Sequence, residues 1–279
     1  MKTVIVALIG RPNTGKSTLL NALIGEKLAP VASVPNTTRV VLRGIYTEED
    51  TQFVCVDTPG LQLGSSPILD TIRKESLKGL SQAHCIIWLT DTSRPLGEEE
   101  KKIELLTADL GKPVIRIYTK SDLPAVISYV GADFVIAAHK IPVRAILDRI
   151  AGYAQIEGPL YDPDFYSDIR PIDRAAEIIR EEAINRLMQE IPHALYARVE
   201  DVNDGQERIR MLAYVVVETE SQKKIVIGTK GSKISEIGQA SRIRISEVYD
   251  KPVDLMLRVA VEAGWTKDIK KVASIFAYD

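Results

Sequence analysis

The sequence contains little cysteine, no long apolar run and almost no net charge. Two cysteines, Cys55 and Cys85, are too few for a disulfide framework, and neither has zinc-ligand partners at the usual spacings. No apolar run approaches the roughly 20 residues that cross a bilayer, and Met1–Thr3 lead directly into a strand pattern instead of a signal peptide. The 36 lysines and arginines balance 38 aspartates and glutamates, so any nucleic-acid surface has to be a local patch. We therefore expect a cytoplasmic protein.

The length of 279 residues favours two domains, because single hydrophobic cores usually stop growing near about 250–300 residues. In the first half, short apolar runs alternate with amphipathic stretches. The expected strands are Val4–Ile9, Val40–Tyr46, Gln52–Val56, Cys85–Leu89, Val114–Tyr118 and Phe134–Ala137. The expected helices are Lys16–Ile24, Ile68–Leu80, Glu98–Leu110 and Val143–Ile150. This alternation predicts an α/β domain over residues 1–152, with a mostly parallel sheet covered by helices on both faces.

The composition changes after residue 152. Residues 153–171 contain Pro159, Pro163 and Pro171 together with several aromatic residues, which indicates an ordered linker whose aromatic side chains dock on a neighbouring domain. The pattern beyond it predicts a helix at Ile172–Glu190, strands at Ala194–Val202 and Met211–Glu220, a helix near Lys233–Tyr249 and a strand near Val253–Val261. That order is typical of a compact α+β domain, here over residues 172–279.

A glycine-rich loop follows the first expected strand. Residues Gly10–Ser17 fit the pattern G-x-x-x-x-G-K-[ST] between a strand and a helix, the context that supports a phosphate-binding loop. The glycines let backbone N–H groups point at phosphate oxygens, Lys16 adds a charge for the β- and γ-phosphates, and the Ser17 hydroxyl can bind Mg²⁺. The nucleotide-binding residues expected here are Asn13, Thr14, Gly15, Lys16, Ser17 and Thr18.

Two further segments are candidates for the γ-phosphate end of the site. The run Asp57–Gly60 ends an apolar strand, where Asp57 can hold Mg²⁺ through water and the Gly60 N–H can sense the γ-phosphate. Thr38, with Thr37 as the alternative, lies in an aperiodic stretch where a mobile switch would bring a hydroxyl to Mg²⁺. The residues expected to act on the reaction are thus Lys16, Thr38 and Gly60, and those expected to hold the metal are Ser17, Thr38 and Asp57.

The run Thr119–Asp122 reads T-K-S-D and follows the expected strand Val114–Tyr118. A carboxylate at the C-terminal edge of a parallel sheet can accept both the N1–H and the N2 amino group of guanine, and adenine offers no such pair of donors. Asp122 is therefore the predicted specificity residue for GTP over ATP. Thr119 and Lys120 are predicted to support the base beside it.

These segments, in this order, resemble the motifs of the Ras-like P-loop GTPases. More narrowly, G-R-P-N-x-G-K-S-T together with D-T-P-G-L is similar to the Era family of bacterial GTPases. The resemblance implies a Ras-like domain that binds GTP and GDP with Mg²⁺ and hydrolyses GTP. It also implies that Ala137 and Ala138 belong to the base site, with the Ala138 N–H facing guanine O6.

The chain departs from the family pattern at several of these positions. Thr119 stands where the family usually has asparagine, and Ala137 stands where it has serine, which predicts a weaker base pocket. Thr119 can still bridge to the phosphate-binding loop, with a single polar arm. Leu61 stands where many GTPases have a water-orienting glutamine, so slow intrinsic hydrolysis is implied. Stimulation by a K⁺-like cation, with Asn13 as a ligand, is an open alternative.

The second half contains a G-x-x-G loop, Gly228–Gly231, before an amphipathic helix. In KH modules such a loop clamps the backbone of four nucleotides. Six positive residues gather around the loop against the single acid Glu236: Lys223, Lys224, Lys230, Lys233, Arg242 and Arg244. The order helix-strand-strand-helix-helix-strand resembles a type II KH fold, and this half is also similar to the Era family. The expected RNA-binding residues are Lys223, Lys224, Ile227, Gly228, Thr229, Lys230, Gly231, Lys233 and Arg242.

The resemblance implies a role in assembly or maturation of the 30S ribosomal subunit, with the KH face on the 3′ end of 16S rRNA and the nucleotide domain timing the contact. A monomer is expected, and peripheral association with the inner face of the membrane stays open. Two rival interpretations remain. One is an RNA-binding assembly factor with a degenerate, weakly hydrolysing nucleotide domain, which a phosphate-release assay distinguishes. The other is a GTPase whose KH-like domain binds protein or membrane, against which co-purifying nucleic acid would argue.

Overall fold

The polypeptide forms two groups of packed elements. The computed structural model describes residues 1–26, 28, 41–59, 66–187 and 195–276. One compact unit contains the described residues up to Asp168, and a second contains those from Ile169 to Ile275. Each unit has its own hydrophobic core, as the length of the chain predicts. Within the described residues, no helix is long and apolar enough to cross a bilayer.

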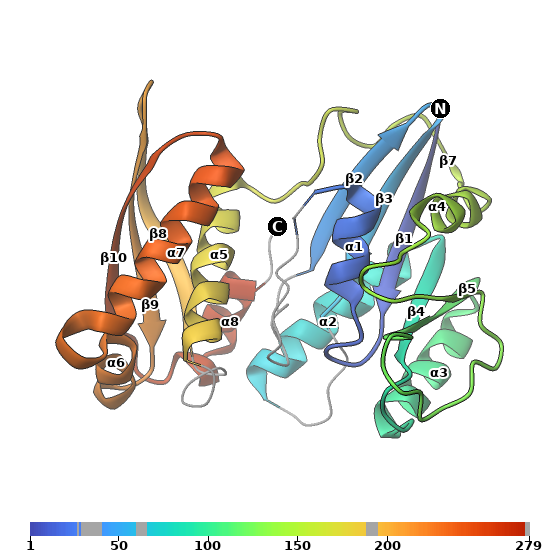
Figure 1. Cartoon of the computed structure of the whole chain (residues 1–279), viewed down its shortest axis with the longest axis horizontal. Helices are drawn as coiled ribbons and strands as arrows, with labels where there is room; N and C mark the ends of the chain where they lie inside the picture. Colours follow the sequence, from blue (N-terminus) through green and yellow to red (C-terminus); the bar gives the residue numbers. More distant parts are fainter. Residues whose placement is uncertain (27, 29–40, 60–65, 188–194, 277–279) are drawn as a thin grey trace. The chain divides into compact units, whose positions relative to one another are not determined.

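The first unit is built on a sheet with the strand order β2-β3-β1-β4-β5-β6 (Figure 1). Its strands are β1 Lys2–Ile9, β2 Leu42–Glu48, β3 Thr51–Asp57, β4 Cys85–Asp91, β5 Val114–Thr119 and β6 Phe134–Val135. Neighbouring strands are parallel except that β2 runs antiparallel to β3, and the short strand β7, Ile156–Glu157, pairs antiparallel with β1. The loop that follows β1 therefore leaves the middle of the sheet at its C-terminal edge, the usual place for a ligand in such a fold.

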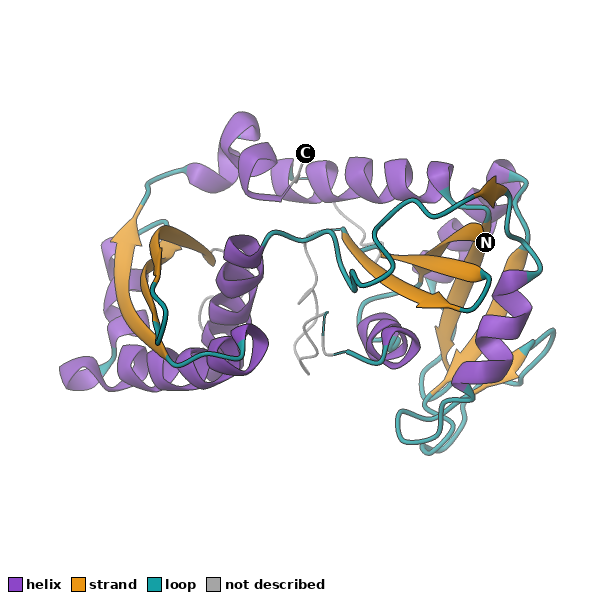
Figure 2. Cartoon of the chain, turned by 90° about the horizontal axis from the view of Figure 1, so that it is seen from above, coloured by secondary structure: helices purple, strands orange, loops and turns teal. Residues whose placement is uncertain are grey.

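Helices cover both faces of this sheet (Figure 2). They are α1 Lys16–Ile24, α2 Pro67–Gln82, α3 Glu98–Leu110 and α4 Val143–Ala151. Alternate side chains of a strand point to opposite faces, and Ala7 and Ile9 of β1 pack in one cluster with Leu80 of α2 and Ile103 of α3. α1 and α4 contact each other and the sheet. The predicted α/β fold with a mostly parallel sheet is confirmed.

The last strand of the first unit is shorter than expected. β6 ends at Val135 instead of Ala137, because the chain turns there and Ala137 pairs with Lys140 in an isolated bridge. Residues 120–133, between β5 and β6, contain no α-helix, which agrees with the short spacing between Asp122 and Phe134.

Most of the segment expected as a linker packs with the first unit. Residues 153–168 are grouped with that unit rather than standing between two domains. The Gln52 side chain accepts hydrogen bonds from the N–H groups of Leu160 and Tyr161 at 2.8 and 3.0 Å, and Ser167 pairs with β2 in an isolated bridge. The segment thereby covers backbone groups of the edge strand β2, which explains why it is ordered against this unit.

The second unit contains a sheet with the order β10-β9-β8, in which β8 and β9 are antiparallel and β9 and β10 are parallel. Its elements are α5 Pro171–Arg186, β8 Leu195–Asp204, β9 Ile209–Val217, α6 Glu220–Ile227, a 3₁₀ turn Thr229–Gly231, α7 Ser232–Tyr249, β10 Val253–Val261, a second 3₁₀ turn Trp265–Lys267 and α8 Ile269–Phe276. The helix-strand-strand-helix-helix-strand order predicted for a KH domain is confirmed. The strand expected to reach Glu220 ends at Val217, because Thr219 caps α6 by accepting a hydrogen bond from the Gln222 N–H at 3.2 Å.

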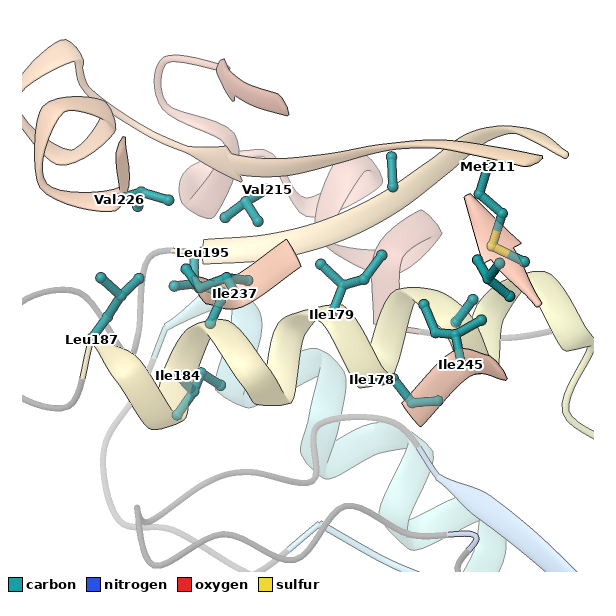
Figure 3. Packing of buried hydrophobic residues seen from close by; sticks show 14 of the residues in the cluster. Ile178, Ile179, Ile184, Leu187, Leu195, Met211, Val215, Val226, Ile237 and Ile245 are labelled. Atoms are coloured by element: carbon teal, nitrogen blue, oxygen red, sulfur yellow. The ribbon is translucent and has the colours of Figure 1, made fainter. Parts of the chain in front are cut away.

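The core of the second unit lies between the sheet and the helices α5 and α7. Ile179 of α5 and Ile237 and Ile245 of α7 are buried with Met211 and Val215 of β9 (Figure 3). α5 packs on β8 and α7, and α7 packs on β10. The loop between α6 and α7 is thus carried by two elements that are themselves anchored in this core.

Candidate functional site

The loop between β1 and α1 needs glycine at both positions where the sequence pattern has it. A Cβ on Gly10 would lie 2.6 Å from the carbonyl oxygen of Leu89 and 2.7 Å from Oγ1 of Thr14, closer than side chains approach. Gly15 has a φ of 90°, in the left-handed region that favours glycine. Asn13 has a φ of 63°, which asparagine tolerates better than most residues. The loop therefore has the curled backbone that a phosphate-binding loop requires.

Lys16 lies in the centre of this loop. Its side chain is buried, and Nζ donates hydrogen bonds to the carbonyl oxygens of Gly10 and Arg11 at 3.1 and 2.8 Å. Burial lowers the pKa of Lys16 to about 8, although the charge of Asp57 opposes this shift. The ammonium group is therefore still mostly protonated at neutral pH, close to the backbone that would surround phosphate oxygens.

Ser17 and Asp57 meet as the sequence predicts. The Ser17 hydroxyl at the start of α1 donates a hydrogen bond of 2.8 Å to Oδ2 of Asp57 at the end of β3. Burial raises the pKa of Asp57 to about 6, against the opposing effects of Lys16 and Ser17. The other carboxylate oxygen, Oδ1, is buried and accepts no hydrogen bond from the described residues. A hydroxyl beside a carboxylate with one unsatisfied oxygen is a donor set that fits Mg²⁺, which prefers oxygen ligands.

The residues predicted to bind the base, Thr119–Asp122 with Ala137 and Ala138, form what we call the base segment, which lies at the C-terminal ends of β5 and β6. Lys120 has a φ of 59°, and the Ser121 N–H donates to the carbonyl oxygen of Ile136 at 3.2 Å, which joins the segment after β5 to the segment after β6. Asp122 and Ala138 are exposed, whereas Thr119 and Ala137 are buried. Groups that would hydrogen-bond to guanine are thus accessible at this edge.

The Thr119 side chain does not make the contact that the sequence suggested. Its hydroxyl lies 3.4 Å from the carbonyl oxygen of Thr90, on β4, instead of bridging to the phosphate-binding loop. Lys120 donates a hydrogen bond of 2.7 Å to Asp91, the last residue of β4. Asp91 and Arg94, which contacts the phosphate-binding loop, lie beside the predicted site residues and are not predicted from the sequence. The sequence contains no local signal for these contacts, because they depend on β4 lying between β1 and β5 in the sheet.

Several predicted residues lie outside the described part of the chain. These are Thr37, Thr38, Gly60 and Leu61. Their roles as switch hydroxyl, γ-phosphate sensor and replaced glutamine therefore stay predictions.

The second candidate site is the turn between α6 and α7. Gly228 and Gly231 have φ values of 72° and 81°, and a Cβ on Gly228 would lie 2.9 Å from the backbone nitrogen of Lys233. Lys230, between the glycines, has a φ of 52° and is exposed. Lys224 is exposed as well, so cations stand on a tight, glycine-dependent turn. Such a turn allows close approach of a nucleic-acid backbone.

One member of the predicted basic cluster faces inward. Arg244 donates hydrogen bonds of 2.7 Å to Glu181 and 2.6 Å to Glu182, both on α5. The exposed Arg242, two residues earlier, is on the solvent side of α7. Burial alone would lower the pKa of Arg244, but the two carboxylates raise it above its ordinary value. The expected set of six cations around the loop is therefore reduced by one.

Comparisons with known proteins match both units. A family model described as "50S ribosome-binding GTPase" matches residues 5–120, and one described as "KH domain" matches residues 190–266. GTPase Era of Mycoplasmopsis agalactiae is 34% identical over 291 residues, covering 100% of both chains. GTPase Era of Lactobacillus delbrueckii subsp. bulgaricus is 36% identical over 293 residues, covering 100% of this chain and 96% of the relative.

Two solved structures are similar over the whole chain. The crystal structure of a variant of Aquifex aeolicus Era bound to GDP·AlF₄⁻ has a TM-score of 0.91 at 27% identity, covering 100% of this chain and 99% of that one. The crystal structure of Era in complex with MgGDPNP and nucleotides 1506–1542 of 16S ribosomal RNA has a TM-score of 0.89 at 26% identity, with the same coverage. The chain therefore belongs to the GTPase Era family, in which a GTPase domain is followed by a KH domain.

Proposed function

We propose that this chain is a GTP-dependent switch that binds the 3′ end of 16S rRNA through its G-x-x-G loop and assists assembly of the 30S subunit. The observation that carries the proposal is the likeness, over the whole chain, to the Era structure with MgGDPNP and 16S rRNA nucleotides. Two features of the structure support it independently. The strained basic turn Gly228–Gly231 suits the RNA backbone, and the Ser17–Asp57 pair suits the Mg²⁺ of the nucleotide.

In the proposed mechanism, the phosphate-binding loop holds the β- and γ-phosphates. Lys16 exchanges its two carbonyl partners for phosphate oxygens, and backbone N–H groups from Asn13 to Thr18 surround the same oxygens. The phosphate charges stabilise the protonated ammonium group and oppose the effect of burial on its pKa.

Mg²⁺ would be held by the Ser17 hydroxyl and, through water, by Asp57. When bound, it supplies positive charge that neutralises the phosphates and polarises the terminal phosphoryl group. Thr38 and the Gly60 N–H are proposed to complete this end of the site when GTP is present. Asp57 then acts as a carboxylate, since a cation next to it lowers its pKa from the raised value.

At the base end of the nucleotide, Asp122 accepts hydrogen bonds from guanine and the Ala138 N–H donates to O6. Thr119, Lys120 and Ala137 support the base.

On the second unit, the proposed RNA site consists of the backbone of the turn and of cations that bind RNA phosphates: Lys223, Lys224, Lys230, Lys233 and Arg242. Ile227 and Thr229 flank them. We further propose that residues 1–152 form the nucleotide-binding domain and residues 172–279 the RNA-binding domain, and that residues 153–171 connect them although residues 153–168 pack with the first unit. We also propose that the protein acts in the cytoplasm as a monomer and that any membrane association is peripheral.

RNA binding in two nucleotide states tests the function. Affinity for an oligonucleotide of the 16S rRNA 3′ end is measured with the protein loaded with a GTP analogue or GDP, against a length-matched 23S rRNA oligonucleotide. Several-fold tighter binding of the 16S sequence in the GTP state is expected, which corresponds to a coupling of about 1–3 kcal/mol. Equal binding in both states, or equal binding of both RNAs, would contradict the proposal.

Matched variants connect the result to the loop. Lys230→Gln removes an exposed cation from the turn and is expected to weaken RNA binding and to reduce its salt dependence. Arg208→Gln is the control, because Arg208 lies directly before the start of β9, whereas the turn comes after the end of β9 and α6. Among the described residues, the Arg208 side chain forms an ion pair with Asp254 alone. The control is expected to bind RNA like the unaltered protein.

A further inference from the structure

The segment after β4 lies between the two loops that would hold a nucleotide. In the sheet, β4 lies between β1, which leads into the phosphate-binding loop, and β5, which leads into the base segment. The loop from Asp91 to Gly97, which connects β4 to α3, therefore leaves the sheet edge with one of these loops on each side.

Asp91 is the buried centre of this connection. Its Oδ2 accepts a hydrogen bond of 2.7 Å from Nζ of Lys120, and its Oδ1 accepts from the N–H and the hydroxyl of Ser93 at 2.9 and 2.6 Å. Nε of Arg94 lies 3.3 Å from Oδ2 in an ion pair. Burial alone would raise the pKa of Asp91, but the hydrogen bonds from Lys120 and Ser93 outweigh it and hold the pKa below its ordinary value. Asp91 is thus a carboxylate that joins a lysine of the base segment to an arginine of its own loop.

Arg94 continues the connection to the phosphate-binding loop. Its Nη2 donates a hydrogen bond of 2.8 Å to the carbonyl oxygen of Pro12. In the opposite direction, Nη1 of Arg11 donates to the carbonyl oxygen of Pro95 and to the carboxylate of Glu100, each at 3.3 Å. Each loop therefore holds the backbone of the other through an arginine.

Thr92 of the same loop also holds the segment that follows β5, through its backbone and its hydroxyl. The N–H and the hydroxyl of Thr92 donate to the carbonyl oxygen of Thr119 at 3.2 and 2.9 Å, and the Thr92 carbonyl oxygen accepts from the Val126 N–H at 2.7 Å. The Thr119 hydroxyl itself points to Thr90 on β4. A continuous relay of side chains from the base segment to the phosphate-binding loop therefore runs from Lys120 through Asp91 and Arg94.

We propose that Asp91 and Arg94 are positioning residues for the guanine nucleotide, which fix the distance between the base segment and the phosphate-binding loop before binding. A nucleotide is one molecule whose two ends meet these two loops, so its affinity depends on how well their separation is set in advance. The proposal rests on the nucleotide site described above, but it concerns affinity and not the chemical step.

Arg94→Gln tests this, because it removes the donor to Pro12 and the ion pair with Asp91. The dissociation rate of fluorescently labelled GDP is expected to rise about tenfold, which corresponds to about 1.4 kcal/mol. KM for GTP should rise by a similar factor, with kcat at saturating GTP unchanged within about twofold. Arg94→Lys can still reach one of the two partners and should recover part of the affinity. The control is Arg144→Gln, which removes another arginine of the first unit that forms ion pairs, with Glu48 and Asp148, and that belongs to none of these loops.

A second probe separates positioning from distortion of the phosphate-binding loop. Inorganic tripolyphosphate, used as a competitor, touches the phosphate-binding loop alone, so its inhibition constant should be the same for Arg94→Gln and the unaltered protein. An equal loss for tripolyphosphate and GDP would overturn the proposal, as would a GDP dissociation rate equal to that of the Arg144→Gln control. If Arg94→Gln does not fold, as judged by its thermal unfolding, Arg94→Lys undergoes the same measurements with an expected two- to threefold change. Failure of the unaltered protein to bind labelled GDP would contradict the proposed function instead.

Discussion

Arg242 and Arg244 are two residues apart on α7, yet the structure predicts opposite consequences for their loss. Arg242 is exposed, whereas Arg244 points at the carboxylates of Glu181 and Glu182 on α5. Successive residues on a helix are rotated by about 100°, so positions two apart face nearly opposite directions. We therefore expect Arg244→Gln to destabilise the second unit and Arg242→Gln to weaken RNA binding.

The magnitude for Arg244 follows from its surroundings. Its side chain is 19% exposed, and the side chains of Glu181 and Glu182 are 4% and 9% exposed. Arg244→Gln removes two charge-assisted hydrogen bonds and leaves Glu181 buried without this cation, while Glu182 keeps its ion pair with Arg186. Breaking a buried pair by removing one partner costs about 3–5 kcal/mol, and partial exposure reduces this to an expected loss of about 2–4 kcal/mol. Arg242→Gln should change stability by less than about 0.5 kcal/mol.

Amide hydrogen exchange measures the loss of stability in each unit separately, and this is needed because the two units need not unfold together. Amides of α5 and α7 should exchange much faster in Arg244→Gln, and amides of α1 in the first unit should be unchanged. RNA affinity and its salt dependence are measured on the same samples at a temperature where both variants are folded. Arg242→Gln should lose RNA affinity and about one unit of the salt slope. Unchanged exchange in Arg244→Gln, together with a loss of RNA affinity equal to that of Arg242→Gln, would falsify the assignment of Arg244 to the core.

Three further predictions concern single residues of the two sites. Because the pKa of Asp57 is raised to about 6, the folded state binds this proton more tightly than the unfolded state, and stability of the nucleotide-free protein falls as pH rises from about 4 to 6. Asp57→Asn should therefore stabilise the nucleotide-free protein at pH 7 by about 1–3 kcal/mol. Scanning fluorimetry should show a smaller stabilisation at pH 5 than at pH 7. The same variant should abolish Mg²⁺-dependent phosphate release. Gly228→Ala forces a Cβ to within 2.9 Å of Lys233 at a φ of 72°, so RNA affinity should fall at least about tenfold in a gel-shift or anisotropy assay, and an unchanged affinity would refute the close-approach argument. Turnover should be faster in KCl than in NaCl, and Asn13→Gly, which keeps the φ of 63° without strain, should remove that difference; equal rates in both salts for the unaltered protein would exclude the cation role.

The sequence predicts well the bounds of those helices and strands whose ends are marked by nearby residues. The expected bounds of α1, α3 and β10 agree with the structure, Lys16–Ile24, Glu98–Leu110 and Val253–Val261. α1 and α3 each end at a glycine in the left-handed region, which is a signal present in the sequence. β6 is two residues shorter than the sequence predicts, and β7 is not predicted at all. Strands of two residues depend on a neighbouring strand and carry little sequence pattern of their own.

The start of α6 was predictable and was nevertheless missed. Thr219 and Gln222 form a capping box, the spacing that marks a helix N-terminus. The β-branched run before it continued the strand pattern and outweighed that signal. In contrast, the contacts of Asp91 and Arg94 were beyond reach, because they depend on β4 lying between β1 and β5, and strand order is not a local property.

Backbone strain provides an independent reason to place function in these loops. Among the described residues, the non-glycine residues with positive φ are Asn13, Glu49, Lys120, Lys230 and Asp250. Three of them, Asn13, Lys120 and Lys230, lie in the phosphate-binding loop, the base segment and the G-x-x-G turn. A non-glycine residue in this region costs about 1–3 kcal/mol and persists where the surrounding structure demands it. Residue chemistry alone predicts the same loops, so motif, charge and backbone strain favour the same three places for the proposed nucleotide and RNA sites.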